Sequence, residues 1–119
     1  MFFIKLGSIF GLLSVVIGSL GAHSLENIIH NKIDIFNTGL YYQMFHSLAL
    51  IITGIISKIT RKNLTKIGFF FITGIILFSG SLYFIAVFKI SHIGIITPIG
   101  GLFLMMGWIL LIYKISFVK

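Results

Sequence analysis

The chain contains no cysteine, a single proline and only two acidic residues among its 119 residues. The absence of cysteine excludes disulfides, thiolate metal sites and cysteine nucleophiles. The two carboxylates, Glu26 and Asp34, lie close together in one short segment, so carboxylate-based catalysis has thin support. No GxSxG, CxxC or phosphate-binding glycine loop occurs. The sequence therefore predicts a protein that is not an enzyme and that holds no cofactor.

Charge is also scarce, because only 9% of the residues are charged while 58% are hydrophobic. A soluble domain typically has about 25% charged and about 45–50% apolar residues. So few charges cannot cover a surface that faces water, and the mean hydropathy of +1.16 agrees with this. The composition indicates an integral membrane protein, and the length of 119 residues indicates a single domain over residues 1–119.

The net charge of +7 is distributed in a way that argues against a nucleic-acid partner. The stretch KITRKNLTK, residues 58–66, carries four basic residues between two apolar runs. This arrangement is typical of a cytoplasmic loop under the positive-inside rule. The interleaved aromatic residues and glycine-rich loops that base stacking or phosphate binding would need are missing there. The expected partner is the lipid bilayer.

Four apolar stretches are long enough to cross a membrane, which takes about 20 residues per helix. They cover about residues 2–22, 39–57, 67–88 and 93–113, and the only charge within them is Lys5. The first stretch resembles a signal peptide in its early lysine, but its length and its spaced small residues favour a retained helix. Two of the three connections are short, so the spans they join are antiparallel neighbours. The predicted fold is an all-α, integral membrane four-helix bundle.

Basic residues fall mostly on one side of this bundle. With an even number of spans, both termini lie on the same side as loop 58–66. That side holds seven of the nine basic residues, while the other side holds Lys32, Lys89 and both acids. The positive-inside rule then predicts that the N-terminus and the C-terminus are both inside.

Residues 24–37, between spans one and two, show the pattern of a short amphipathic helix lying in the membrane interface. Ser24 is its predicted N-cap, and Gly39 is its predicted stop. The apolar face consists of Leu25, Ile28, Ile29, Ile33 and Phe36. The polar face consists of Glu26, Asn27, His30, Asn31, Asp34 and Asn37.

Small residues recur at steps of three and four along the first span and predict a helix-packing face. In lipid, apolar side chains gain little from meeting each other, so helices associate where small residues let their backbones approach. The residues of this face are Gly7, Gly11, Ser14, Gly18 and Gly21. A groove for a substrate is the alternative interpretation of the same pattern.

Polar side chains inside the other spans predict a thin polar seam within the bundle. The seam residues are Gln43, His46, Ser79, Ser81 and Thr97. Facing lipid without a partner would cost such groups several kcal/mol, on the order of 2–7 for an amide or hydroxyl. We expect His46 to be buried in the outer third, about 10 Å below the surface, as a neutral ring. Its expected partners are Gln43 or the hydroxyls of spans three and four, and a proton relay at His46 is the alternative.

Three residues of the connection after span one offer a different alternative. His23, Glu26 and His30 are spaced i, i+3 and i+7, which places them on one face of a continuous helix. Imidazole and carboxylate are suitable ligands for a transition metal. The favoured interpretation is a hydrated polar face without a metal, because no tight HxxxH or HExxH spacing is present.

Four short motifs, taken together, resemble a known family. They are GAHSL at 21–25, YYQMFHSLAL at 41–50, LFSGSLY at 77–83 and TPIGG at 97–101. In this order and spacing they are similar to the small bacterial membrane proteins called domain of unknown function 423, which have a short eukaryotic transmembrane relative. The resemblance implies a four-span protein of the bacterial inner membrane, and it implies no reaction and no ligand. The matching positions are Gly21, Ala22, His23, Tyr42, Gln43, His46, Ser79, Gly80, Ser81, Tyr83, Thr97, Pro98, Gly100 and Gly101.

Two functions remain from the sequence. The favoured one is a structural or accessory membrane module, whose partner is a second copy or another membrane protein. The alternative is a small carrier or an ion- or proton-handling protein with a polar site around His46 and Gln43. The first is favoured because a bundle of this size has little room for a gated pathway.

Overall fold

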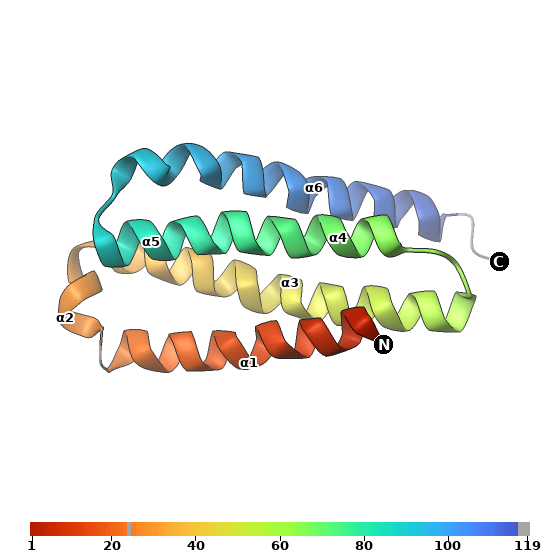
Figure 1. Cartoon of the computed structure of the whole chain (residues 1–119), viewed down its shortest axis with the longest axis horizontal. Coiled ribbons are helices and arrows are strands. Elements are labelled where there is room, and N and C mark those ends of the chain that lie inside the picture. Colours follow the sequence, from red (N-terminus) through yellow and green to blue (C-terminus); the bar gives the residue numbers. More distant parts are fainter. Residues whose placement is uncertain (24, 117–119) are drawn as a thin grey trace.

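The computed structural model describes residues 1–23 and 25–116, and these residues form helices and no strands (Figure 1). Four helical stretches in this part of the chain are long and apolar enough to cross a membrane. They are Phe2–Ala22, Glu26–Thr60, Thr65–Phe88 and Ser91–Ile115. The predicted fold class, an all-α bundle of four spans, is confirmed. The predicted N-cap Ser24 lies outside the described residues.

The four stretches are subdivided by short irregular turns. In chain order the elements are α1 (Phe2–Ala22), α2 (Glu26–Ile29), the 3₁₀ turn η1 (His30–Lys32), α3 (Ile33–Thr60), α4 (Thr65–Gly74), the π-helical turn η2 (Ile75–Ser79), α5 (Gly80–Phe88), the 3₁₀ turn η3 (Ser91–Ile95) and α6 (Ile96–Ile115). The third span is thus α4, η2 and α5 in sequence, and η3 leads directly into α6.

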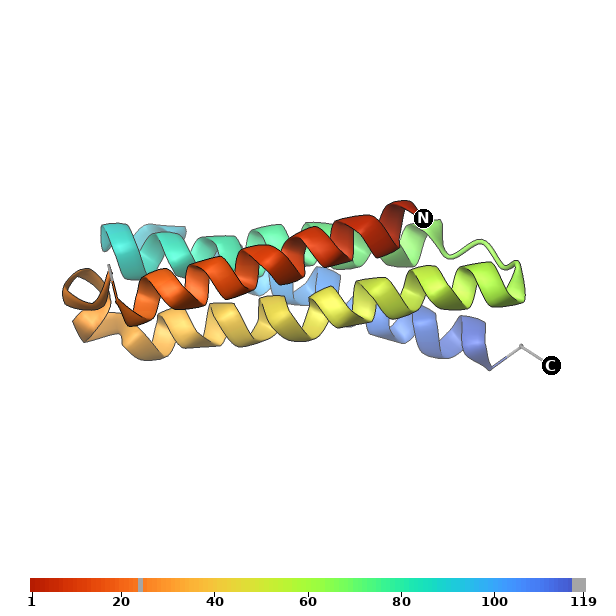
Figure 2. The same ribbon diagram turned by 90° about the horizontal axis from the view of Figure 1, so that it is seen from below.

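The helices run up and down beside one another. α3 contacts both α1 and α5 (Figures 1 and 2). α6 contacts α4 and η2, so it packs mainly on the third span and has few contacts with α3. The N-terminus, the α3–α4 connection and the last turn of α6 lie at one end of the bundle. α2 and η3 lie at the other end. We call these the basic end and the α2 end.

The connection between α1 and α3 differs from the single interfacial helix predicted over residues 24–37. α2 has only four residues, a 3₁₀ turn follows, and residues from Ile33 onward already belong to α3. The reason is burial, because Ile29 and Phe36 are 0% and 2% exposed and pack with Ala86 of α5. Two residues of the predicted apolar face therefore pack into the bundle, while Ile28 and Ile33 remain exposed.

Close packing of α1 on α3 uses part of the predicted small-residue face. Gly7, Ser14 and Gly21 are buried and seven residues apart, as in a heptad seam. A Cβ at Gly7 would lie 2.9 Å from the carbonyl oxygen of Ser47, and one at Gly21 would overlap the ring of Phe36.

Gly18 and Gly11, the two remaining residues of that face, differ in how closely another helix approaches them. A Cβ at Gly18 would lie 3.2 Å from the Leu40 side chain, whereas one at Gly11 would meet nothing within 4 Å. The prediction that Gly11 packs against another helix is therefore wrong. A seven-residue repeat keeps one line of residues against α3, and Gly11 falls beside that line.

At the π-helical turn η2 the backbone of α6 comes very close to the backbone of the third span. A Cβ at Gly100 would lie only 2.8 Å from the carbonyl carbon of Leu77 and even nearer to the backbone nitrogen of Phe78. Gly100, Leu104, Gly107 and Leu111 are the buried residues of α6, and their spacing of three and four gives one continuous seam. Below the turn, Leu104 and Leu111 join the main apolar core with Phe71 and Leu50.

Candidate functional site

Gln43 ties three helices together in the bundle interior. It is 3% exposed, and its Nε2 donates a hydrogen bond to the carbonyl oxygen of Phe10 on α1 at 2.8 Å. The hydroxyl of Tyr83 on α5 donates to Gln43 Oε1 at 2.6 Å. Both ends of the amide are therefore used between helices, as the predicted seam requires. Tyr83 was matched to the family motif but not assigned to the seam, although a phenol in an apolar span also needs a partner.

His46 uses both of its ring nitrogens within the protein. Trp108 Nε1 of α6 donates to His46 Nε2 at 2.9 Å. Indole is a donor only, so Nε2 must be the acceptor, and the ring proton belongs on Nδ1. Nδ1 then donates to the carbonyl oxygen of Tyr42 at 2.8 Å. The geometry describes a neutral ring with both positions satisfied, at 5% exposure.

Trp108 is not among the partners expected for His46, which were Gln43, Ser79, Ser81 and Thr97. The difference comes from depth. α3 begins at Ile33 and has 28 residues, so His46 lies near its middle and not in the outer third. This level corresponds to the Trp108 turn of α6. Trp108 is the only tryptophan of the chain, and its N–H in an apolar span is the signal that points to such a partner.

The three hydroxyl residues of the predicted seam make two separate ties. Ser79 Oγ donates to the carbonyl oxygen of Gly39 at 2.6 Å, joining η2 to α3. The hydroxyls of Ser81 and Thr97 are hydrogen-bonded to each other and join α5 to α6. All five predicted residues thus take part in hydrogen bonds between or within the packed helices, but they do not meet at one point.

The seam is complete in itself. Within residues 1–23 and 25–116, every buried side-chain nitrogen and oxygen has a hydrogen-bond partner. Such pairing is what a polar group needs in lipid, where an orphaned donor or acceptor is costly. The hydrogen bonds of the seam connect all four spans.

A groove of about 580 Å³ opens between α3 and α6, beside the His46–Trp108 pair. The ring of Tyr42 packs on that of Phe78 of η2 in a tilted arrangement with centroids 4.5 Å apart, and Phe45 packs against Trp108 at 5.8 Å. The side chains of Tyr41, Phe45 and Met105 are more than half exposed along its edges. The lining residues are Tyr41, Tyr42, Phe45, His46, Phe78, Gly101, Leu104, Met105 and Trp108.

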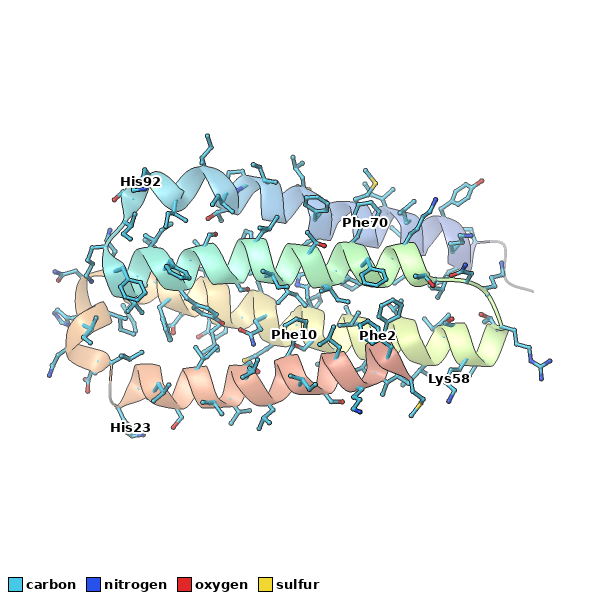
Figure 3. All side chains as sticks on the ribbon, viewed as in Figure 1. Phe2, Phe10, His23, Lys58, Phe70 and His92 are labelled. Carbon is cyan, nitrogen blue, oxygen red and sulfur yellow. The ribbon has the colours of Figure 1, made fainter. Side chains whose placement is uncertain are left out.

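The alternative metal site does not form. His23 follows α1 with a non-helical backbone, and α2 begins only at Glu26, so the continuous helix that would align His23, Glu26 and His30 is broken. Among the described residues, no three histidine, aspartate or glutamate side chains lie close enough to hold a metal ion. Figure 3 shows His23 pointing away from the bundle at the α2 end, with His92 on the opposite side of that end.

Fold and site together define a multi-pass α-helical membrane protein with an internally satisfied polar seam. A family model described as "Protein of unknown function (DUF423)" matches residues 17–101. The chain belongs to this family, as its motifs indicated.

Curated relatives extend the similarity over most of the chain. A UPF0382 membrane protein of Staphylococcus haemolyticus is 43% identical over 111 residues, which is 92% of this chain and 91% of the relative. The UPF0382 membrane protein YwdK of Bacillus subtilis is 41% identical over 113 residues, covering 92% of each chain. No solved structure matches the chain. The chain is therefore a multi-pass membrane protein of a family whose activity is uncharacterised.

Proposed function

We propose that this protein is a structural or accessory membrane module without enzymatic activity, whose polar residues lock the bundle. The observation that carries the proposal is the closed hydrogen bonding of the seam. Both side-chain polar atoms of Gln43 and both ring nitrogens of His46 are hydrogen-bonded to other groups of the protein. A binding site for a polar solute needs groups that are free to exchange partners, and a relay needs a ring nitrogen open to a proton.

The proposed location is the bacterial plasma membrane, with both termini in the cytoplasm. Support comes from the charge distribution along the bundle. Six described basic residues belong to the basic end, namely Lys5, Lys58, Arg61, Lys62, Lys66 and Lys114. Glu26 and Asp34 both belong to the α2 end (Figure 1). The positive-inside rule places the basic end in the cytoplasm, and the curated relatives cited are bacterial.

The partner of such a module is a second copy or another membrane protein. The α3–α6 groove supports this part of the proposal. Its edges are exposed aromatic and apolar side chains, and Gly101 in its wall lets another backbone approach.

The groove also favours a second candidate function, a small carrier or proton-handling protein. It reaches the His46–Trp108 pair near the middle of α3, where a translocation site would lie. In this case His46 would have to exchange its Trp108 bond for a substrate or a proton during turnover.

Flux measurements on purified protein in proteoliposomes separate the two functions. The panel comprises protons, alkali cations and small amphipathic solutes, with empty liposomes and the His46→Ala variant as controls. We expect no flux above that of empty liposomes, and we expect His46→Ala to lower stability only. A flux that the wild type supports and His46→Ala abolishes, with the variant still folded, would replace the module by the carrier.

A further inference from the structure

A second, smaller cavity of about 290 Å³ lies at the basic end, where α1 starts, α3 ends and α4 starts. Its rim is polar and consists of Ser57, Lys58 and Thr65, and Phe2, Phe3 and Phe69 form its apolar wall. Figure 3 shows Phe2 and Lys58 at this same end of the bundle. We call this cavity the basic-end pocket. Its walls combine a cation, hydroxyl groups and aromatic rings within one small volume.

Among the described residues, no carboxylate pairs with the ammonium group of Lys58. Lys58 Nζ contacts the thioether sulfur of Met1 at 3.1 Å, which is a weak acceptor without charge. The only acids, Glu26 and Asp34, belong to the α2 end, so no carboxylate of the described residues neutralises this end. Five further described basic residues belong to the same end of the bundle. A concentration of unpaired positive charge at a membrane surface attracts anions.

The apolar wall consists of packed aromatic rings that are partly exposed at the protein surface. The rings of Phe2 and Phe3 are 5.4 Å apart, and Phe3 meets Phe69 edge-on at 5.6 Å. Phe2 and Phe69 remain 59% and 50% exposed despite this packing. A ligand that covered these rings would need an apolar portion directly joined to its anionic group. A free inorganic anion offers no such portion.

We propose that the basic-end pocket binds the headgroup of an anionic phospholipid. The phosphate accepts hydrogen bonds from Lys58 Nζ and Thr65 Oγ1, and the start of an acyl chain lies against Phe2 and Phe69. A volume of about 290 Å³ holds a headgroup with its glycerol and leaves the chains in the bilayer. The site is independent of the function proposed above and of the orientation, since it needs the anionic lipid in one leaflet only.

Lipid retention on the purified full-length protein tests this site. The protein is exchanged into detergent with dioleoyl phosphatidylglycerol, with dioleoyl phosphatidylcholine or with inorganic phosphate, and bound lipid is counted by native mass spectrometry. We expect phosphatidylglycerol to be retained and phosphatidylcholine to be lost. Lys58→Gln should weaken phosphatidylglycerol binding about tenfold, because one charge-assisted hydrogen bond is removed. Thr65→Val, which keeps the shape of the side chain, should weaken it by a smaller factor.

The matched control is Lys114→Gln, which removes the same charge at the same end but lines no part of the pocket. We expect it to retain phosphatidylglycerol as the wild type does. Equal losses in Lys58→Gln and Lys114→Gln would show general charge attraction and overturn the site. Retention of phosphatidylcholine equal to that of phosphatidylglycerol would also overturn it. If inorganic phosphate displaced the lipid at low millimolar concentration, the lipid assignment would fail in favour of a phosphate site.

Discussion

A histidine in the middle of a membrane bundle is stable as a neutral ring only when it finds one donor and one acceptor. His46 finds the indole N–H of Trp108 and the carbonyl oxygen of Tyr42 one turn earlier. The Trp108 bond spans α3 and α6, which otherwise face each other across the groove. His46, which the sequence presents as a candidate relay, thus also connects α3 to α6 through this bond.

Replacing Trp108 by phenylalanine tests that tie. Trp108→Phe removes the donor and leaves His46 Nε2 buried without a partner. We expect the free energy of unfolding to fall by about 1 kcal/mol beyond the loss from ring size, between the average of about 0.6 and the maximum of about 1.7 kcal/mol for interhelical hydrogen bonds in a membrane protein. The measurement is a double-mutant cycle with His46→Leu, using denaturant unfolding in mixed micelles. Equal costs of Trp108→Phe in both backgrounds would show that the bond contributes nothing.

At the scale of helices, glycine residues determine how closely neighbouring helices pack. α1 meets α3 through a seven-residue repeat, and α6 meets the third span where the π-helical turn brings its backbone forward. At Gly100 only backbone atoms occupy the space that a Cβ would take, and at Gly7 the Ile51 side chain occupies it together with the Ser47 carbonyl. Each helix also has a nearby glycine, Gly11 in α1 and Gly101 in α6, at which a Cβ would meet no atom closer than 3.6 Å. Each helix therefore offers a pair of matched substitutions.

The first matched pair is in α1. Gly7→Leu places a large side chain against the Ser47 carbonyl and the Ile51 backbone, so it should separate α1 from α3. Gly11→Leu meets nothing within 4 Å at its Cβ and should be tolerated. Thermal unfolding in detergent, followed by size-exclusion profiles, should show a loss for the first variant only. The opposite order would mean that α1 is rotated from the position described.

The second pair is in α6. Gly100→Ala brings a methyl group against the backbone of Leu77 and Phe78, which cannot move aside without opening η2. We expect a loss of about 1–3 kcal/mol, as for overpacking of a tight site. Gly101→Ala meets only the Phe78 ring at 3.6 Å and should change stability little. Unfolding free energies of the two variants, measured side by side, check this; comparable losses would contradict the close approach at η2.

The whole molecule is polarised along its long axis. Both acids lie at the α2 end, together with Lys32 and Lys89, whereas the six other described basic residues lie at the opposite end, where α1 begins and α6 ends (Figure 1). This distribution of charge supports the proposed orientation. It also gives the end that holds the basic-end pocket an excess of positive charge among the described residues.

Single cysteines test this orientation, because the natural chain has none. Asn31 and Asn63 are exposed and lie at opposite ends of the bundle. With an impermeant maleimide added to intact cells, we expect Asn31→Cys to react at once and Asn63→Cys only after the membrane is opened. Labelling of both from one side would refute the four-span topology, and the reverse order would invert the orientation.

Local composition determined the class, the number of spans and the identity of the polar residues. Hydropathy is a property of each segment taken alone, and every polar side chain in an apolar helix must be paired wherever that helix packs. Gln43, His46, Ser79, Ser81 and Thr97 could therefore be named without knowing the fold. The resemblance to the family followed from short motifs for the same reason.

Only the tertiary structure decided which groups meet. The Gln43–Phe10 bond joins residues 33 positions apart, and the His46–Trp108 bond joins residues 62 positions apart. Such pairs depend on the relative depth and rotation of helices, which no single segment encodes. For the same reason residues 33–37, predicted as part of the interfacial helix, belong to α3, because Phe36 is buried against α5 only once the helices are assembled.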